Sequence, residues 1–356
     1  MGVYGGKAPV VSKILFPFSK RETIISYMKT HIKVYRLTFI MPNNIIVTGG
    51  TGFIGNKLCE ELLKNPNNIV TCIDNNSTGC EHNIEALKTN PRFAFIYHNV
   101  KDPYFTDQPI HEIYHLACPA SPPQYQLNSI DTLETNVFGT VNFLELAKRH
   151  NAKFLLASTS EIYGDPMVSP QNESYWGNVN TLGPRSCYDE GKRCAETFTY
   201  EYHKNYNVDV RIVRLFNTYG PKMNKDDGRV ISNFINQAIR NEDITVYGTG
   251  TQTRCFCYID DTVRGLISLM NMDGYGGAVN IGTTFMYTML NVAEIVIQLT
   301  GSNSKIVYKE CPIDDPTNRL PDINKAKQLL NWEPTVTFVD GLAKTIDYYM
   351  SIKSLF

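Results

Sequence analysis

The sequence predicts an α/β fold: a doubly wound parallel sheet with a smaller C-terminal lobe. From Asn43 onward, short apolar runs rich in β-branched residues alternate with longer segments whose apolar residues recur at helical spacing. Such alternation is typical of parallel strands joined by right-handed helical crossovers. After about Pro221 the alternation weakens into shorter pieces and glycine turns, which indicates a lobe of a different kind.

The strands and helices can be placed one by one from this alternation. Six strands are predicted, at residues 44–48, 69–74, 93–98, 112–116, 153–158 and 208–215. Helices are predicted at residues 55–64, 131–150 and 188–205. We therefore predict a sheet domain at residues 41–220 and a lobe mainly at residues 221–356, with some segments of the lobe returning to the sheet domain.

Charge is unevenly distributed along the chain. The 356 residues carry a formal net charge of −1, from 34 basic and 35 acidic residues. Residues 1–40 hold seven basic residues and one acidic residue, a net charge of +6, which leaves −7 for the remainder. We predict that this basic extension lies outside the fold. Three interpretations of it remain open: an organelle-targeting or membrane-surface segment, an RNA-binding arm, or sequence upstream of a second start at Met41.

Composition argues against several classes of protein. An apolar content of 42% is ample for a folded core, and the near-neutral charge argues against a protein that binds nucleic acid or anionic lipid through a basic surface. The apolar stretches are too short to span a membrane, which takes about 20 residues. The nine cysteines show no spacing typical of zinc or of a redox pair. We predict reduced thiols, no metal site, and a cytosolic or nuclear compartment, with the cytoplasm as the expected location.

The first motif that carries chemistry is Gly-Gly-Thr-Gly-Phe-Ile-Gly at residues 49–55, between the first strand and the first helix. Gly49, Gly52 and Gly55 permit a tight turn and a close approach of the backbone to a pyrophosphate, which the N-terminal N–H groups of the helix would bind. Asp74 ends the second strand, where its carboxylate can accept hydrogen bonds from an adenosine ribose. It would repel a 2′-phosphate, so the motif predicts a Rossmann-type domain that binds NAD rather than NADP.

The second motif is Tyr-Asp-Glu-Gly-Lys at residues 188–192. The spacing of four places Tyr188 and Lys192 on one face of a helix. An adjacent ammonium and an oxidised nicotinamide ring would lower the pKa of the phenol from about 10, so that it could act as a base. Earlier in the chain, a Ser-Thr-Ser-Glu segment at residues 158–161 ends a strand. A hydroxyl there could hydrogen-bond the same substrate oxygen.

With these motifs, the chain resembles the extended short-chain dehydrogenase/reductases and, among them, the UDP-glucuronic acid decarboxylases. The resemblance covers residues 43 to about 349 and rests on HLACPASPPQY (115–125), TSEIYGDP (159–166), GPRSCYDEGKR (183–193), DGRVISNF (227–234) and RLPD (319–322). In the family's sugar nucleotide 4,6-dehydratases, the residue between the Thr and the Glu is an Asp that protonates the departing 6-hydroxyl. This chain has Ser160 there, as a decarboxylase does, because CO2 departs without help from an acid.

The resemblance implies decarboxylation of UDP-glucuronate with a tightly bound NAD that is recycled. Tyr188 would remove the proton of the C4 hydroxyl while hydride passes to NAD+, and Thr159 would hold that oxygen. The product is a β-keto acid, which loses CO2 readily because the new ketone accepts the electron pair. Protonation at C5 and return of the hydride would then give UDP-xylose.

The resemblance also implies three groups of site residues. The catalytic group is Tyr188, Lys192, Thr159, Ser160, Glu161 and Arg319. The NAD-binding group is Gly49, Gly52, Phe53, Ile54, Gly55, Asp74, Asn75, Thr78, Gly79, Asn99, Val100, Tyr188, Lys192 and Thr218. The UDP-sugar group is Tyr125, Arg185, Asn217, Asn233, Tyr247, Arg254 and Arg319, in which guanidinium forks suit carboxylate or diphosphate. The helices at 131–150 and 188–205 would form the four-helix interface of a homodimer.

Three positions depart from the family's pattern. Asn99 stands where the family usually has Asp and keeps an acceptor for adenine. Glu134 stands in place of the usual Lys, beside the expected sugar and nicotinamide region, and reverses the charge. Lys222 replaces an Arg, which keeps the charge but loses the planar fork. At Cys118 a nucleophile could be considered, but the sequence places no base nearby, so we expect a packed thiol.

Three alternative functions remain open. The first is a sugar nucleotide 4,6-dehydratase or 4-epimerase of the same family, which Ser160 argues against. The second is a partial decarboxylase that releases the UDP-4-keto-pentose. The third is a dinucleotide-binding protein without catalysis, which would usually lack the Tyr or the Lys, whereas this chain has both.

Overall fold

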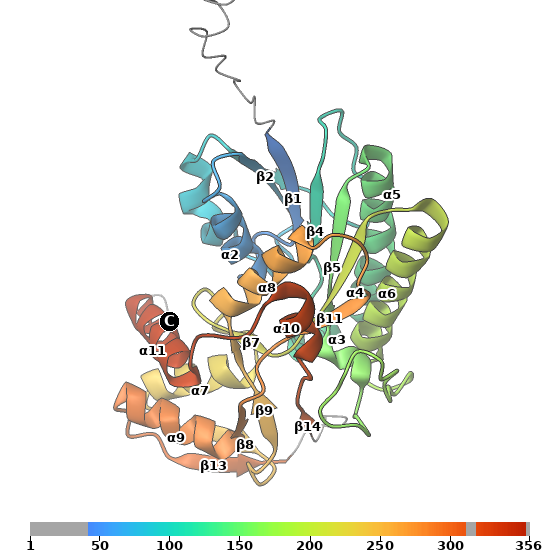
Figure 1. Ribbon diagram of the computed structural model, residues 1–356. Helices are drawn as coiled ribbons and strands as arrows, with labels where there is room; N and C mark the ends of the chain where they lie inside the picture. The colour runs from blue at the N-terminus through green and yellow to red at the C-terminus, as the bar shows by residue number, and fades with distance from the viewer. Residues whose placement is uncertain (1–41, 311–317, 354–356) are drawn as a thin grey trace, which may run out of the picture. The chain divides into compact units, whose positions relative to one another are not determined.

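A parallel sheet forms the centre of the computed structural model, which describes residues 42–310 and 318–353; the predicted basic extension lies outside these residues. Within them, seven strands follow the order β11-β6-β5-β4-β1-β2-β3 (Figure 1). In chain order they are β1 (Asn43–Thr48), β2 (Asn68–Asp74), β3 (Phe93–Tyr97), β4 (Glu112–His115), β5 (Lys153–Thr159), β6 (Val210–Leu215) and β11 (Ala278–Ile281). The six predicted strands are confirmed, and β11 comes from the C-terminal part of the chain.

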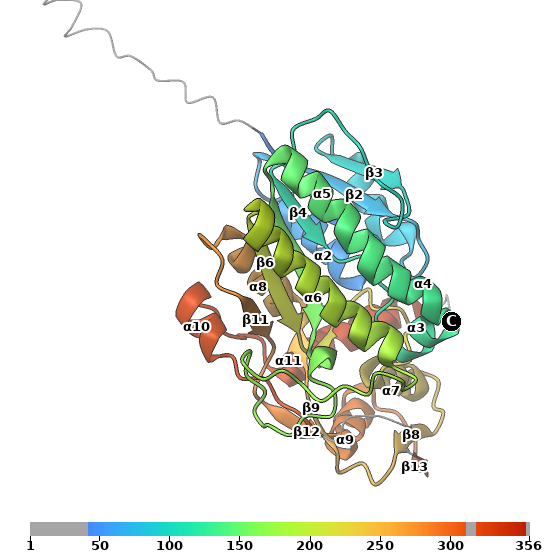
Figure 2. The ribbon, with the colours of Figure 1, turned by 90° about the vertical axis from the view of Figure 1, so that its right-hand side faces the viewer.

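Helices cover both faces of the sheet, which confirms the doubly wound fold. On one face, α2 (Phe53–Leu62) packs beside α8 (Ile259–Asn271) (Figure 1). On the other, α5 (Thr140–His150) lies alongside α6 (Ser186–Tyr206) (Figure 2). Apolar side chains from the sheet and from these helices fill the space between the layers.

The predicted helix at 131–150 is interrupted. A first segment, α4 (Ser129–Glu134), continues into α5 through a π-helical turn, η2 (Thr135–Gly139). Gly139 ends this turn where the backbone lies close to the loop after β3, since a Cβ at Gly139 would lie 2.9 Å from Cγ2 of Val100. π-Helical turns are frequent at functional sites, and this one brings Thr135 to the wall of the cavity described below.

The remaining elements connect the sheet to the C-terminal lobe. Two 3₁₀ helices and one short helix belong to the first part of the chain: η1 (Glu81–Thr89), η3 (Ser160–Tyr163) and α3 (Pro122–Leu127). The later helices are α7 (Val230–Ile239), α9 (Met289–Thr300), α10 (Asn324–Leu330) and α11 (Phe338–Ser351). Small sheets pair β7 (Thr218–Tyr219) with β10 (Cys257–Tyr258), β8 (Ile244–Tyr247) with β13 (Ile306–Lys309), and β9 (Thr253–Cys255) with β12 (Met286–Thr288) and β14 (Asn318–Arg319). The domain boundary at residue 220 stays a prediction. In the described ranges, no helix is both long and apolar enough to cross a membrane.

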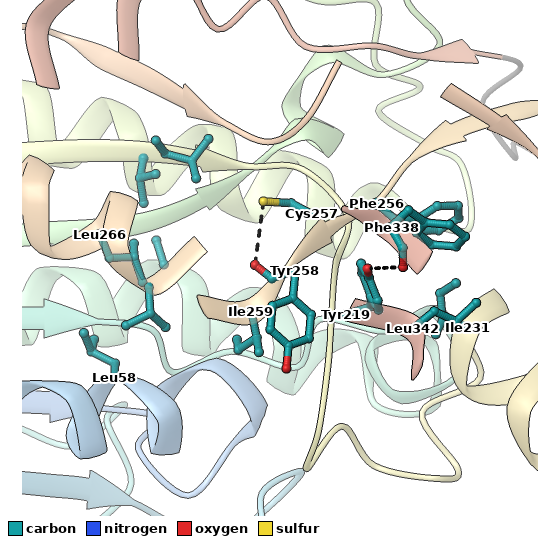
Figure 3. Packing of buried hydrophobic residues seen from close by; sticks show 14 of the residues in the cluster. Leu58, Tyr219, Ile231, Phe256, Cys257, Tyr258, Ile259, Leu266, Phe338 and Leu342 are labelled. Atoms are coloured by element: carbon teal, nitrogen blue, oxygen red, sulfur yellow. Dashed lines mark hydrogen bonds between the residues drawn. The ribbon is translucent and has the colours of Figure 1, made fainter. Parts of the chain in front are cut away.

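One apolar cluster joins the sheet to the lobe. It runs from Leu58 of α2 and Leu266 of α8 to Phe338 of α11 (Figure 3). The hydroxyl of Tyr219 donates a 2.9 Å hydrogen bond to the carbonyl of Phe338, so the polar group of this buried ring is satisfied. Because the cluster is continuous, the lobe is held against the carboxyl ends of the strands, and the walls of the site keep their spacing.

Asp261 of α8 anchors the segment between α10 and α11. Asp261 is 1% exposed, and its carboxylate accepts hydrogen bonds of 2.9 Å from the backbone N–H groups of Thr335 and Val336. Its carbonyl accepts a 3.0 Å bond from the indole of Trp332, itself buried. A buried carboxylate that satisfies several donors at once cannot be removed without leaving them unpaired.

We expect Asp261→Ala to lower the free energy of unfolding by roughly 3–5 kcal/mol, because it leaves buried donors and the Arg264 guanidinium without their acceptor. Chemical denaturation followed by circular dichroism measures this. Asp260→Ala is the matched control: Asp260 is 48% exposed and pairs with Lys57 at 3.3 Å, so its loss should cost less than about 1 kcal/mol. Equal losses for the two variants would contradict the anchoring role of Asp261.

Candidate active site

One cavity of about 970 Å³ brings the predicted residues together. Every residue of the predicted catalytic, NAD-binding and UDP-sugar groups lines it. It opens at the carboxyl ends of the parallel strands, where a doubly wound sheet binds its ligands, and the C-terminal lobe forms its other wall. The sequence therefore predicted which residues meet; their individual roles stay predictions.

The glycine loop fits a pyrophosphate. Gly49 has a positive φ of 74°, and a Cβ there would lie 2.9 Å from the backbone nitrogen of Ala117. A Cβ on Gly55 would lie 2.1 Å from the carbonyl oxygen of Gly49, so only glycine fits at either position. Helix α2 begins at Phe53, and no side chain caps its N-terminus. Its first N–H groups can therefore bind an anion in the cavity.

Asp74 lies at the end of β2 with its carboxylate oriented by the backbone. One oxygen accepts a 3.0 Å hydrogen bond from the N–H of Thr51, and the other accepts a 2.8 Å bond from the N–H of Asn76. Each oxygen keeps a lone pair for a further donor, such as a ribose hydroxyl. Asn99, after β3, accepts a bond of 3.1 Å from the N–H of Lys101, so its acceptor atom is already engaged locally.

Tyr188 and Lys192 lie in the first turns of α6, which packs on β5. Both are buried, with exposed fractions of 6% and 4%. Thr159, the last residue of β5, lies close enough to Tyr188 that its side chain lowers the pKa of the phenol. The ammonium of Lys192 donates a 2.9 Å hydrogen bond to the carbonyl of Ala157. The structure thus joins the phenol and the threonine hydroxyl at one point and holds the lysine against the same strand.

The predicted lowering of the Tyr188 pKa involves a bound nicotinamide ring and stays a prediction. Burial raises the pKa of Tyr188 above its usual value, because the phenolate loses water in a closed cavity. The side chain of Thr159 and the charge of Arg229 act in the opposite direction without overcoming burial. Burial likewise lowers the pKa of Lys192, against the fields of Cys118 and Glu196.

Tyr125 of α3 stacks on the ring of Tyr188. The ring centroids of Tyr125 and Tyr188 are 5.0 Å apart, and their planes differ by 4°. Although the hydroxyl of Tyr125 is buried, it has no hydrogen-bond partner among the described residues. A buried hydroxyl usually finds a partner, so this one is available to a polar ligand in the cavity.

Guanidinium groups surround Glu161. Its Oε2 accepts hydrogen bonds from Arg185 and, at 3.0 Å, from Arg319. Burial by itself would raise the pKa of Glu161, but the charges of Arg319, Arg185 and Arg254 lower it to about 2. Nearby, burial and Glu161 raise the pKa of Asp189 to about 7, but Asp189 does not line the cavity. The cavity wall therefore carries an ionised Glu161 with guanidinium groups around it, and guanidinium forks suit a carboxylate or a phosphate.

The lobe supplies the other polar side chains. β14 pairs with β9 in a register that sets Arg319 opposite Arg254. Asn233 of α7 donates a 3.0 Å hydrogen bond to the carbonyl of Gly228 and also borders the cavity. Asn217 follows β6, and Tyr247, which ends β8, is 41% exposed at the rim. The hydroxyl of Thr218 already donates to the carbonyl of Phe216 at 3.1 Å, so Thr218 offers the cavity little more than its backbone and methyl group.

Glu134 does not lie where the sequence placed it. It ends α4 away from the cavity, and its carboxylate accepts a 2.9 Å hydrogen bond from the ammonium of Lys101. Its side chain is 41% exposed. The π-helical turn that follows rotates Thr135 toward the cavity instead. The reversed charge at position 134 is thus balanced by Lys101 outside the site.

The other two positions that depart from the family's pattern, Asn99 and Lys222, do line the cavity. The ammonium of Lys222 donates a 3.1 Å hydrogen bond to the carbonyl of Asn83, and so connects the lobe to η1.

Burial raises the pKa of the Cys118 thiol, which keeps it protonated. A protonated thiol is a poor nucleophile, in agreement with the expected packed thiol.

Arg229 is a cavity residue to which the sequence analysis assigned no role. It forms an ion pair with Asp227, with a 2.9 Å contact between Nη2 and Oδ2, and its positive charge favours the phenolate of Tyr188. Its signal is the DGRVISNF segment, from which the sequence predicts only Asn233 as a site residue. Residue spacing alone does not indicate that the charge of Arg229 affects the pKa of Tyr188.

Comparisons with known proteins identify the family of the chain. The family model described as GDP-mannose 4,6 dehydratase matches residues 46–345. UDP-glucuronic acid decarboxylase 6 of Arabidopsis thaliana is 53% identical over 298 residues, which make up 84% of this chain and 86% of that protein. UDP-glucuronic acid decarboxylase 1 of Danio rerio is 49% identical over 329 residues, 92% of this chain and 78% of that protein.

A solved structure shares the fold. UDP-glucuronic acid 4-epimerase from Bacillus cereus, in complex with UDP-glucuronic acid and NAD, is 32% identical and superposes with a TM-score of 0.79. The match covers 88% of this chain and 100% of the epimerase. The chain belongs to the family described by the GDP-mannose 4,6 dehydratase model, an extended short-chain dehydrogenase/reductase family, and within it to the UDP-glucuronic acid decarboxylases.

Proposed function

We propose that the chain converts UDP-glucuronate to UDP-xylose and CO2, with NAD held in the glycine-loop half of the cavity. The observation that carries this proposal is the cluster around Glu161. Guanidinium groups beside Tyr188 and Thr159 suit a substrate with a carboxylate on the sugar, and family members near 50% identity are decarboxylases of UDP-glucuronic acid. Ser160 and an ionised Glu161 supply no acid for the loss of a 6-hydroxyl, which argues against a dehydratase.

The chain's own residues account for the proton transfers. Tyr188 takes the proton of the C4 hydroxyl and returns it later, while Thr159 holds the same oxygen by a hydrogen bond. When bound, NAD supplies a hydride acceptor for C4 and a positive charge that favours the Tyr188 phenolate. Arg319 and Arg185 hold the substrate carboxylate near C5. Once C4 is a ketone, the C5 carboxylate leaves as CO2, because the ketone accepts the electron pair as an enolate. A proton taken up at C5 and the return of the hydride to C4 would then give UDP-xylose.

The 4-epimerase alternative keeps one specific observation in its favour, the shared fold and 32% identity with UDP-glucuronic acid 4-epimerase. The structure of that epimerase holds the same sugar nucleotide, so substrate recognition does not separate the two activities. What differs is the fate of the carboxylate after oxidation at C4. The product therefore decides between the two functions.

We expect incubation with UDP-glucuronate and NAD to yield UDP-xylose and one CO2 per turnover, measured by NMR of the nucleotide sugar together with CO2 detection. An epimerised uronic acid without CO2 would indicate the epimerase. Accumulated UDP-4-keto-pentose would indicate partial decarboxylation with inefficient hydride return. Turnover of UDP-glucose without turnover of UDP-glucuronate would overturn the proposed function.

We expect Tyr188→Phe to lower kcat by about 10²–10⁴-fold, because the variant lacks the hydroxyl that exchanges the C4 proton. Its bound NAD, measured by absorbance and by release on denaturation, should remain at the wild-type level. Tyr200→Phe is the matched control, since Tyr200 lies on the same helix and is 44% exposed; its kcat should not change. Wild-type turnover by Tyr188→Phe would exclude the phenol as the base.

We also propose a homodimer through the helical face formed by α4, α5 and α6 (Figure 2). Large apolar side chains are exposed on and beside α4: Leu127 is 88% exposed, Ile130 67% and Phe138 53%. Apolar groups gathered in this way typically mark an interaction surface. The cytoplasmic location stays a prediction from the cysteine pattern.

We expect Ile130→Asp to convert the dimer to a monomer, because association would bury an unpaired carboxylate in an apolar interface. Light scattering coupled to size exclusion gives the mass. The substitution lies at an exposed position, so the free energy of unfolding of the monomer should change by less than about 0.5 kcal/mol. Tyr308→Asp, at a 58% exposed position on β13, is the control and should remain dimeric. A wild-type chain that is monomeric at all concentrations would contradict the proposal.

A further inference from the structure

A largely buried ion pair lies one helical turn beyond Lys192. Glu196 of α6 pairs with Arg214 of β6 through two contacts, Nε to Oε1 at 3.0 Å and Nη2 to Oε2 at 2.8 Å. The side chains are 14% and 12% exposed. Tyr188, Lys192 and Glu196 recur at a spacing of four, so they form one stripe along the face of α6 that packs on the sheet.

This pair is joined to the strand that carries Thr159. The hydroxyl of Ser158 donates a 2.6 Å hydrogen bond to Oε1 of Glu196. Ser158 lies opposite Arg214 in the register of β5 and β6. One residue earlier, the carbonyl of Ala157 accepts the hydrogen bond of Lys192. Helix α6 is therefore attached to the last residues of β5 at two successive points, directly before Thr159.

Arg214 extends the same network to η3, which carries Ser160 and Glu161. Its Nη1 donates to the hydroxyl of Tyr163 at 3.0 Å and to the carbonyl of Glu173 at 3.1 Å. The hydroxyl of Tyr163, the last residue of η3, in turn donates to Oδ1 of Asn280 at 2.8 Å. One ion pair thus connects the three elements that carry the proposed reaction centre: α6, β5 and η3.

Glu196 also supplies the negative charge near Lys192. Three titratable groups interact electrostatically with Lys192: Cys118, which follows β4, Glu196 on its own helix, and His115 at the end of β4. Tyr188 lies one helical turn before Lys192. Burial, then the charge of Lys192, lowers the pKa of His115 to about 3, so this imidazole is neutral. The thiol of Cys118 and the phenol of Tyr188 have raised pKa values and are neutral as well. Among these groups Glu196 alone is anionic.

We propose that Glu196, held by Arg214 and Ser158, is a positioning residue that keeps Lys192 in its charged form and fixes the face of α6 against the end of β5. The proposal rests on the proposed function for its kinetic consequence. The state of Lys192 itself is a property of the chain and can be measured without turnover.

The experiment is Glu196→Gln in the full-length chain with bound NAD. Removing the anion disfavours the ammonium, so the pKa of Lys192 should fall by about one unit, an ordinary perturbation in a folded protein. Acetic anhydride labelling of Lys192 across pH, read by mass spectrometry, measures that pKa directly. Because the charged lysine supports the phenolate, the basic limb of the pH profile of kcat/KM for UDP-glucuronate should move to lower pH by the same amount.

Two further variants give the controls. Glu201→Gln removes a carboxylate from the same helix whose side-chain hydrogen bond, 2.8 Å from Asn205, lies away from the site; the labelling pKa and the pH profile should stay at their wild-type values. Glu196→Asp keeps the charge but is one methylene shorter. It should leave the basic limb in place while lowering kcat severalfold, because the contacts to Ser158 and Arg214 are stretched.

The outcomes separate this inference from the proposed function. If folded Glu196→Gln shows neither the labelling shift nor the displaced limb, the role of Glu196 is overturned. If that variant does not fold, Glu196→Asp decides: wild-type kcat would overturn the positioning role, and lowered kcat with an unmoved limb would support it. If the wild-type chain does not turn over UDP-glucuronate, the proposed function fails, while the labelling comparison still tests the state of Lys192.

Discussion

The rest of the structure depends on one constraint: the face of α6 that carries ionisable side chains is buried against β5 and β6. Tyr188, Lys192 and Glu196 project from α6 onto β5 and β6, and burying an unpaired charge there would cost several kcal/mol per ion. The chain compensates through specific partners: the carbonyl of Ala157 for the ammonium, and Arg214 for the carboxylate. These partners fix the orientation of α6 about its axis and its position along the sheet, so the phenol of Tyr188 lies near Thr159. The arrangement that makes the site possible is also what allows the helix to pack.

The second half of the site follows from the way the lobe is attached. Arg254 and Arg319 are 65 positions apart in the sequence, yet the β9–β14 pairing sets them opposite each other, next to Glu161. The apolar cluster around Phe338 and the hydrogen bonds of Asp261 hold the lobe to the sheet. Three guanidinium groups therefore act on Glu161 from separate segments of the chain. Their placement depends on contacts far from Tyr188 and Thr159.

Much of this architecture could be predicted from the sequence, and the failures have physical causes. The six strands and the glycine loop were predictable because their signals are local, namely apolar runs and glycines that tolerate no Cβ. The π-helical turn before α5 was not, because helical periodicity does not distinguish a turn widened by one residue. Glu134 was placed beside the site by resemblance alone, and resemblance does not report that its carboxylate pairs with Lys101. Residue spacing also does not report the loss of water that raises the pKa of Tyr188 in the chain without NAD.

By itself, the sequence determined the fold class, the nucleotide loop and the set of residues that could share one site, since each depends on residue type and short-range spacing. Only the tertiary structure decided how the charges are balanced. It decided that Lys192 bonds to Ala157, that Arg229 acts on Tyr188 from across the cavity, and that Glu196 joins α6 to β5 and β6. These outcomes depend on burial and on distances between segments far apart in the chain, and neither quantity is encoded in local spacing.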